Sequence, residues 1–182
     1  MRGVVPTSSK GGCEHMANME DVEFKERLFL KGYPFKHYGP RPGDPVANAV
    51  TPLQKPLSAC TVALVTTAGL SLPDQEPFDL TIRNGDSSFR EIPSHISPQL
   101  LEMNQRSWSF DQTGILRDRN MAFPLDRLRE MQQRGEIAAL APRNYSFMGS
   151  IVGPAKLMKE SAPEVARRLK ADAVDVVLLT PV

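Results

Sequence analysis

Residues 59–67, with the sequence ACTVALVTT, decide the predicted fold, and residues 174–180, VDVVLLT, repeat their pattern. Both stretches are short, nearly unbroken runs of apolar and β-branched residues. Such runs are typical of strands buried on both faces of a parallel sheet, whereas strands with one solvent-facing side alternate polar and apolar residues. The two stretches therefore predict an α/β domain built on a parallel sheet.

Two helical patterns lie between these strands. Residues 124–134 begin with a proline, which suits a first helical turn, and Gly135 follows, as is typical of helix ends. Residues 161–172 begin with Ser161 and Glu164, whose spacing is that of a capping box. This alternation predicts a Rossmann-like parallel sheet flanked by helices. Shorter elements are predicted as strands at residues 88–92 and 137–141, and as an apolar stretch at residues 145–152.

The beginning of the chain has no structural pattern. Residues 1–18 show no hydrophobic period, and the Lys-Gly-Gly at residues 10–12 can be encoded by a sequence that contains a bacterial ribosome-binding site. We therefore expect translation to start at Met16 or Met19, so that the residues before it are a leader. A genuine disordered tail is the alternative.

Residues 19–57 predict a short amphipathic helix and then an extended arm. Six prolines between residues 33 and 57 exclude a helix or a central strand from the arm, because each proline removes a backbone donor and restricts φ. Residues 58–182 are the predicted α/β domain, which we expect to be incomplete.

The composition excludes several classes of protein. Of 182 residues, 41% are hydrophobic and 24% are charged, which predicts a globular chain. The formal net charge of +1 disfavours nucleic-acid binding, and no apolar run reaches the ~20 residues of a membrane helix. No secretory signal is present, so we expect a cytoplasmic protein. Because Cys13, Cys60 and three dispersed histidines lack metal-ligand spacing, we expect neither a disulfide nor a metal site.

Ligands of parallel sheets bind beyond the carboxyl ends of the strands. Two such ends carry polar residues here, at residues 66–69 and at residues 180–182. No glycine-rich nucleotide fingerprint follows the first strand, which makes a nucleotide-binding domain a weaker interpretation.

Six blocks of the sequence, which span most of the chain from about Lys55 onward, occur in the order of a known family. Together they resemble the selenoprotein B family of glycine, sarcosine, betaine and D-proline reductases. The blocks are CTVALVTTAGL (60–70), LPDQEPFD (72–79), GDSSFREIP (85–93), DRNMAFPLDRLREM (118–131), YSFMGSIVG (145–153) and SAPEVARRLKADAVDVVLLTPV (161–182).

The resemblance implies a reductase that cleaves a carbon–nitrogen bond in an amino acid or betaine. In the family the reactive atom is the selenium of a selenocysteine, or a cysteine sulfur in variants, directly after the LLTPV-type strand. It would fall immediately after Val182, so we expect no catalytic residue within these 182 residues. The implied partners are other reductase subunits, a thiol or thioredoxin-type reductant, and a separate chain that carries a pyruvoyl group.

Because the selenocysteine codon is UGA, we expect this sequence to be a premature reading of a longer selenoprotein and to be inactive as it stands. The alternative is a non-catalytic α/β module that binds a small ligand or a partner subunit and has lost its redox residue.

The resemblance also suggests substrate-binding candidates, each with a structural alternative. Backbone N–H groups of the first loop could hold a carboxylate, or the loop could simply end a strand. The D-x-N pair could orient substrate, although we favour helix capping, and the tyrosine could line the cleft or pack in the core. We expect Asp86 and Arg90 to form a surface pair rather than a carboxylate clamp. The candidates are Thr66, Thr67 and Gly69 in the loop, Asp118 and Asn120 in the pair, and Tyr145.

Overall fold

The computed structural model describes residues 52–107 and 112–182. Pro52–Val182 form one compact unit. The predicted leader, the N-terminal helix and the arm up to residue 51 lie outside the described residues, as do Cys13 and Met16. None of the helices in the described part of the chain is long and apolar enough to cross a membrane.

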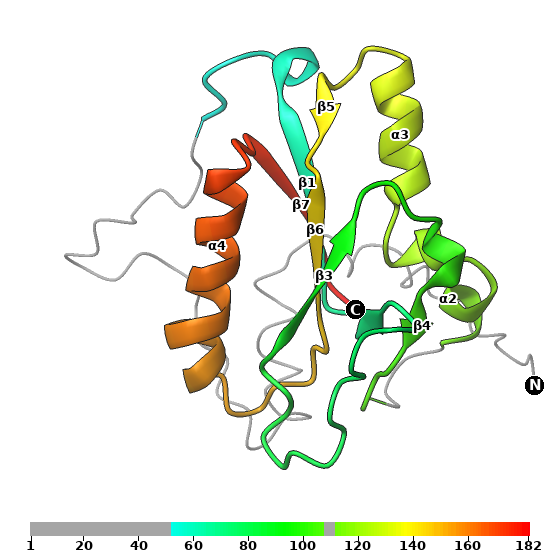
Figure 1. Ribbon diagram of the computed structural model, residues 1–182, viewed down its shortest axis with the longest axis vertical. Helices are drawn as coiled ribbons and strands as arrows, with labels where there is room; N and C mark the ends of the chain where they lie inside the picture. Colours follow the sequence, from blue (N-terminus) through cyan, green and yellow to red (C-terminus); the bar gives the residue numbers. More distant parts are fainter. Residues whose placement is uncertain (1–51, 108–111) are drawn as a thin grey trace, which may run out of the picture. The chain divides into compact units, whose positions relative to one another are not determined.

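A mixed five-stranded sheet forms the centre of this unit (Figure 1). Strand β1 (Thr61–Thr66) is parallel to β5 (Ala139–Leu140), β6 (Arg143–Phe147) and β7 (Val176–Thr180). Because Val62 pairs with both Leu140 and Val176, β5 and β7 must lie on opposite sides of β1. Strand β3 (Phe89–Pro93) is antiparallel to β6.

The remaining elements are short. A second sheet has two antiparallel strands, β2 (Leu70–Ser71) and β4 (Glu102–Met103). The α-helices are α2 (Thr113–Arg117), α3 (Leu125–Gln133) and α4 (Ala162–Ala171). Single helical turns are η1 (Leu57–Ala59), η2 (Pro98–Leu100), η3 (Arg119–Met121) and the π-helical η4 (Leu157–Ser161).

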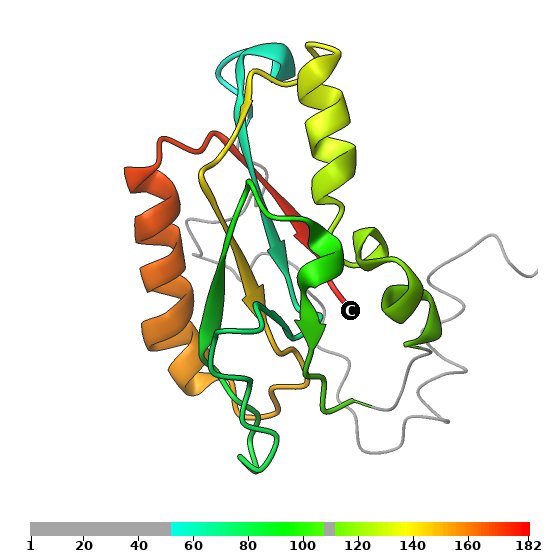
Figure 2. The ribbon, with the colours of Figure 1, turned by 45° about the vertical axis from the view of Figure 1, so that its right-hand side comes forward.

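The two faces of the sheet carry separate apolar cores. Leu64 and Ile92 pack with Leu125 and Leu128 of α3, and Ala63 and Tyr145 pack with Val165 and Leu169 of α4. Figures 1 and 2 show α3 and α4 on opposite sides of the strands. The structure confirms an α/β domain. Its sheet is mixed because of β3, so it is not the all-parallel sheet expected, and the Rossmann-like topology remains a prediction.

The predicted capping box does not form. Ser161 has helical dihedral angles, and its side chain makes no cap hydrogen bond, because η4 already precedes α4. Glu164 instead pairs with Arg167 and Arg168. The hydrogen bond from Arg167 lowers the pKa of Glu164 most, and with the one from Arg168 it brings this pKa to about 2. Pro163 explains the wider π-turn, since a proline ring clashes with the carbonyl four residues earlier in a regular α-helix.

Strand β7 is less buried than its sequence predicts. Leu178 is 39% exposed and Leu179 is 66% exposed, although β1 contains the same kind of apolar run and is almost fully buried. The difference follows from position, because β7 pairs with β1 alone among the described strands and lies at an edge of the sheet. An edge strand has an unpaired row of backbone groups.

We expect Leu128→Ala and Leu169→Ala each to lower the free energy of unfolding by about 2–5 kcal/mol, because truncation leaves a cavity between helix and sheet. Leu128 is 5% exposed and Leu169 is 8% exposed, one on each face. Urea denaturation measures the loss. The exposed Lys170→Ala is the control and should change stability by less than about 0.5 kcal/mol. Unchanged midpoints for both leucine variants would contradict this packing.

Candidate functional site

The parallel strands β1, β6 and β7 end side by side. Thr66 of β1 is in register with Ser146 of β6 and with Thr180 of β7. Figure 2 shows β7 reaching this edge beside the letter C. The loops after β1 and β6 begin here, so the structure brings residues 66–69 and 180–182 together, as the sequence predicts for parallel strands.

The backbone N–H groups of the loop after β1, from Thr67 to Leu70, donate hydrogen bonds to acceptors within the chain. These donors are therefore not available to a substrate carboxylate, and the expected backbone cradle is not formed by them. The bonds are Thr67 N to Thr180 O (3.2 Å), Ala68 N to Thr66 Oγ1 (3.2 Å), Gly69 N to Phe147 O (2.8 Å) and Leu70 N to Ser146 Oγ (2.8 Å).

Two glycines allow backbones to approach closely at this edge. Gly69 has a φ of +67°, and a Cβ there would lie 2.4 Å from the carbonyl oxygen of Asn104. Gly149 also has a φ of +67°, and a Cβ there would lie 2.7 Å from the Thr67 carbonyl oxygen. Any side chain at either position would force the loops apart.

The Thr67 side chain fixes the chain after β7. The Thr67 Oγ1 accepts a hydrogen bond from Val182 N at 2.8 Å and lies 3.3 Å from Val182 O, to which it can donate. Thr180 Oγ1 donates to Ala122 O at 2.8 Å, which ties the end of β7 to the segment before α3. The Thr67 hydroxyl therefore holds Val182, the residue that follows β7 and Pro181.

Sequence reasoning missed Gln105, which connects the loops of this site. Its Nε2 donates to Met148 O at 2.6 Å and to Thr67 O at 3.1 Å. Its Oε1 accepts from the N–H groups of Arg106 and Ser107. The side chain is buried and fully hydrogen-bonded. No sequence pattern marks it, because it lies in a polar stretch without a period.

Arg90 and Asp86 are not the surface pair expected from sequence. Asp86 is buried and Arg90 is half-buried, and Arg90 donates to the carbonyls of Glu76 (2.6 Å) and Pro77 (2.9 Å) while its guanidinium stacks over Phe78. Burial opposes ionisation of Asp86, but hydrogen bonds from Ser88 and Asp79, with the nearby Arg90, hold its pKa below the ordinary value. The pair therefore holds the loop before β3 in place.

Asp118 and Asn120 form the caps that we favoured. Asp118 Oδ1 accepts from Asn120 N at 2.9 Å at the start of η3, and this backbone bond is the main cause that lowers the pKa of Asp118. Asn120 Oδ1 accepts from Asp126 N at 3.0 Å in the first turn of α3. These contacts direct both side chains to helix starts.

Tyr145 lies in the core on the α4 face of the sheet. Its ring makes an edge-to-face contact with Phe89, with centroids 5.7 Å apart. Its hydroxyl is buried without a hydrogen-bond partner among the described residues, and burial raises its pKa. Tyr145 therefore packs the core rather than lining the loops after the strands.

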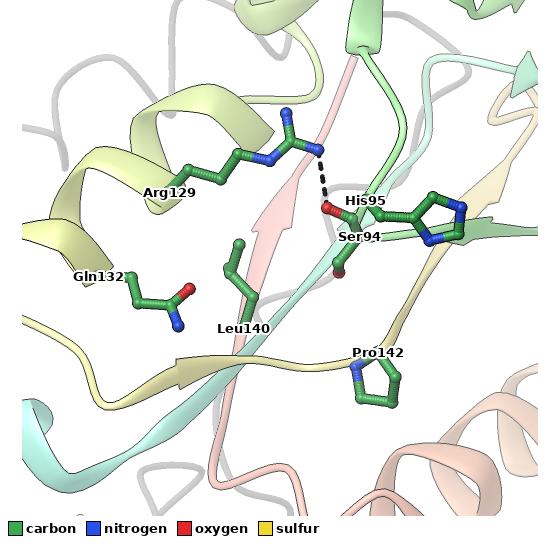
Figure 3. Close-up of a pocket in the computed structure, with 6 residues that line it drawn as sticks. All are labelled: Ser94, His95, Arg129, Gln132, Leu140 and Pro142. Atoms are coloured by element: carbon green, nitrogen blue, oxygen red, sulfur yellow. Dashed lines mark hydrogen bonds between the residues drawn. The ribbon is translucent and has the colours of Figure 1, made fainter.

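One pocket of about 330 Å³ lies at the opposite edge of the sheet, near the start of β6 (Figure 3). Arg129 is the cation among its lining residues, but it already pairs with Asp126 and donates to Ser94 O and Ile96 O. This pocket is therefore a weaker candidate than the carboxyl edge, where α/β sheets bind ligands. The lining residues are Ser94, His95, Arg129, Gln132, Leu140 and Pro142.

Together, these contacts define an α/β domain in which hydrogen bonds connect the loops at the carboxyl ends of the parallel strands. Residues 28–182 match the family described as Glycine/sarcosine/betaine reductase selenoprotein B (GRDB). The chain belongs to this family, as the six blocks indicate. It has no significant match among solved structures.

Curated relatives carry reductase names. The chain is 40% identical over 151 residues to "D-proline reductase subunit gamma" of Acetoanaerobium sticklandii, an alignment that covers 83% of this chain and 59% of the relative. It is 26% identical to "Glycine reductase complex component B subunit gamma" of Carboxydothermus hydrogenoformans, over 93% of this chain and 37% of the relative. It is also 26% identical to "Sarcosine reductase complex component B subunit beta" of Peptoclostridium acidaminophilum, over 94% and 37%. The chain thus spans less than two thirds of each relative.

We expect Gln105→Glu to lower the free energy of unfolding by about 1–3 kcal/mol, because a carboxylate oxygen would face the Thr67 and Met148 carbonyls in place of a donor. Urea denaturation measures the change. Gln133→Glu makes the same chemical change at an exposed position of α3 and should stay within about 0.5 kcal/mol of the wild type. Equal effects at the two positions would contradict the bridging role of Gln105.

We expect Tyr145→Phe to leave stability unchanged or to raise it by up to about 1 kcal/mol, since the variant removes a buried hydroxyl without a partner. Tyr145→Ala, which removes the ring, should cost about 3–5 kcal/mol. Thermal and urea unfolding of both variants test this. A loss above about 1 kcal/mol for Tyr145→Phe would show that the hydroxyl has a partner in solution.

Proposed function

We propose that this chain forms the α/β part of a reductase subunit that cleaves a carbon–nitrogen bond in an amino acid or betaine. The identity of 40% to a D-proline reductase subunit carries the proposal. The names of the other relatives, subunits of glycine and sarcosine reductase complexes, support the same reaction class.

We further propose that the residue following Val182 in the full-length protein is the reactive selenocysteine or cysteine. The main chain at Val182 fits such a role because the Thr67 hydroxyl holds both its N–H and its carbonyl group. A selenol or thiol at this position supplies an anionic nucleophile. Thr67, Gln105 and Gly149 keep the surrounding loops in place through the contacts described above.

Cys60 does not suit this role, although it is the one cysteine in the described part of the chain. It is fully buried, and its thiol donates to Pro56 O at 3.4 Å. It also precedes β1, at the edge of the sheet opposite the ends of the parallel strands. A buried thiol in apolar surroundings is inert.

The proposed net reaction is a two-electron reduction. The carbon–nitrogen bond breaks, carbon and nitrogen each gain a hydrogen, and a dithiol becomes a disulfide, which supplies both electrons and both protons. The dithiol, and a pyruvoyl group where the reaction uses one, would come from other cytoplasmic components of the complex.

The gene and its full-length product test this function. We expect a UGA or cysteine codon after the Val182 codon and, with partner subunits and a dithiol, reduction of D-proline to 5-aminopentanoate or of glycine, sarcosine or betaine to the free amine. Replacement of the residue after Val182 by serine should abolish turnover, whereas Cys60→Ser should retain it. A non-catalytic module predicts no turnover of any of the four substrates by the full-length protein.

A further inference from the structure

Arg106 differs from most partly buried arginines of this chain. Four others form ion pairs with carboxylates, namely Arg90, Arg129, Arg143 and Arg168. No carboxylate lies within ion-pair distance of Arg106 among the described residues. Its Nη1 donates instead to two carbonyl oxygens, Ile82 O at 2.6 Å and Arg83 O at 3.0 Å.

The position of Arg106 places it at the carboxyl edge of the sheet. It directly follows Gln105, whose amide is bonded to Thr67 O after β1 and to Met148 O after β6. The backbone N–H of Arg106 is bonded to the same Gln105 side chain at 2.9 Å. The backbone of Arg106 is thus part of the network that holds Val182 through Thr67.

The carbonyl bonds hold the guanidinium through one nitrogen. Nε and Nη2 keep N–H groups without a partner among the described residues, and these two groups form the edge of a guanidinium that binds a carboxylate with two parallel hydrogen bonds. The half-buried guanidinium donates to carbonyl oxygens only, so its charge can still pair with an anionic ligand. The loop after β1 has no free N–H group for such a ligand, because residues 67–70 donate within the chain.

Two other arginines fit less well. Arg119, which also lacks a carboxylate partner among the described residues, uses Nε and Nη1 on Leu101 O and Ile115 O, so its carboxylate-binding edge is already occupied. Arg83 is exposed on the loop that Arg106 holds.

We propose that Arg106 is the anchor for the carboxylate of the substrate. This inference rests on the proposed function, because each candidate substrate, D-proline, glycine, sarcosine or betaine, has one carboxylate next to the carbon that loses nitrogen. Anchoring that carboxylate holds the adjacent carbon beside Arg106, whose neighbour Gln105 is bonded to Thr67, the residue that holds Val182. Arg106 is then a substrate-binding residue that discriminates an acid from its amide.

The test compares D-proline, glycine, sarcosine and betaine, each with its carboxamide, by calorimetric titration of the full-length protein used for turnover. We expect the wild type to prefer at least one acid over its amide. Arg106→Gln should weaken binding of that acid about 10- to 100-fold and leave the amide within about twofold, because only the acid makes a charge-assisted bidentate pair. Arg106→Lys should recover part of the loss.

Arg83→Gln is the matched control, since it removes the neighbouring exposed cation, and it should bind the acid as the wild type does. Circular dichroism establishes that each variant is folded, and Arg106→Lys carries the comparison if Arg106→Gln is not folded. Unchanged acid binding in a folded Arg106 variant would overturn the anchor while wild-type turnover leaves the proposed function standing. If the wild type turns over a substrate but binds that acid no more tightly than its amide, the anchor alone is overturned. If the wild type turns over none of the four substrates, the proposed function fails as well.

Discussion

The central strand β1 is the constraint on which the rest of the structure depends, because every backbone group of a buried strand needs a partner. Val62, Ala63 and Leu64 are at most 3% exposed. Strand β7 pairs along the whole of one side, but on the other side the ladder is interrupted between β5 and β6. The buried Asn144 fills this gap, since its Oδ1 accepts from Leu64 N at 2.7 Å. Its Nδ2 donates to Ser94 Oγ at 2.6 Å, which connects the gap to the end of β3.

The same requirement shapes the candidate site. Beyond β1 the chain turns away from the sheet, and its N–H groups must still be satisfied in a buried environment. Thr66, Ser146 and the Phe147 and Thr180 carbonyls accept these bonds. As a result, the backbone of this loop is a fixed platform, and recognition of a ligand is left to side chains. Thr67 holds Val182 after β7 through its hydroxyl, Arg106 holds the Ile82 carbonyl through its guanidinium, and Gln105 holds the loops together.

Most polar side chains near the sheet have a structural role. Tyr145 and Ser146 are neighbours in β6, yet the tyrosine packs against α4 while the serine hydroxyl accepts from Leu70 N. Asp118 and Asn120 belong to one of the six family blocks, but their hydrogen bonds stabilise the starts of η3 and α3. The loop before β3 depends on the half-buried Arg90, which holds two of its carbonyls. Polar residues of this domain thus mostly support backbone, and few remain for chemistry.

The sequence alone determined the α/β class, the family and the positions of β1, β7, α3 and α4, because apolar period and turn residues are local properties. Pro124 and Gly135 bound α3 closely to where their chemistry predicts. Tertiary structure decided what depends on neighbours. Among the described strands it paired β7 with β1 alone, despite a core-like sequence, and it placed Ser161 inside a helix rather than at its cap. It also brought Gln105 into contact with Thr67, 38 residues away, which no local pattern encodes because the two residues meet only in the folded domain.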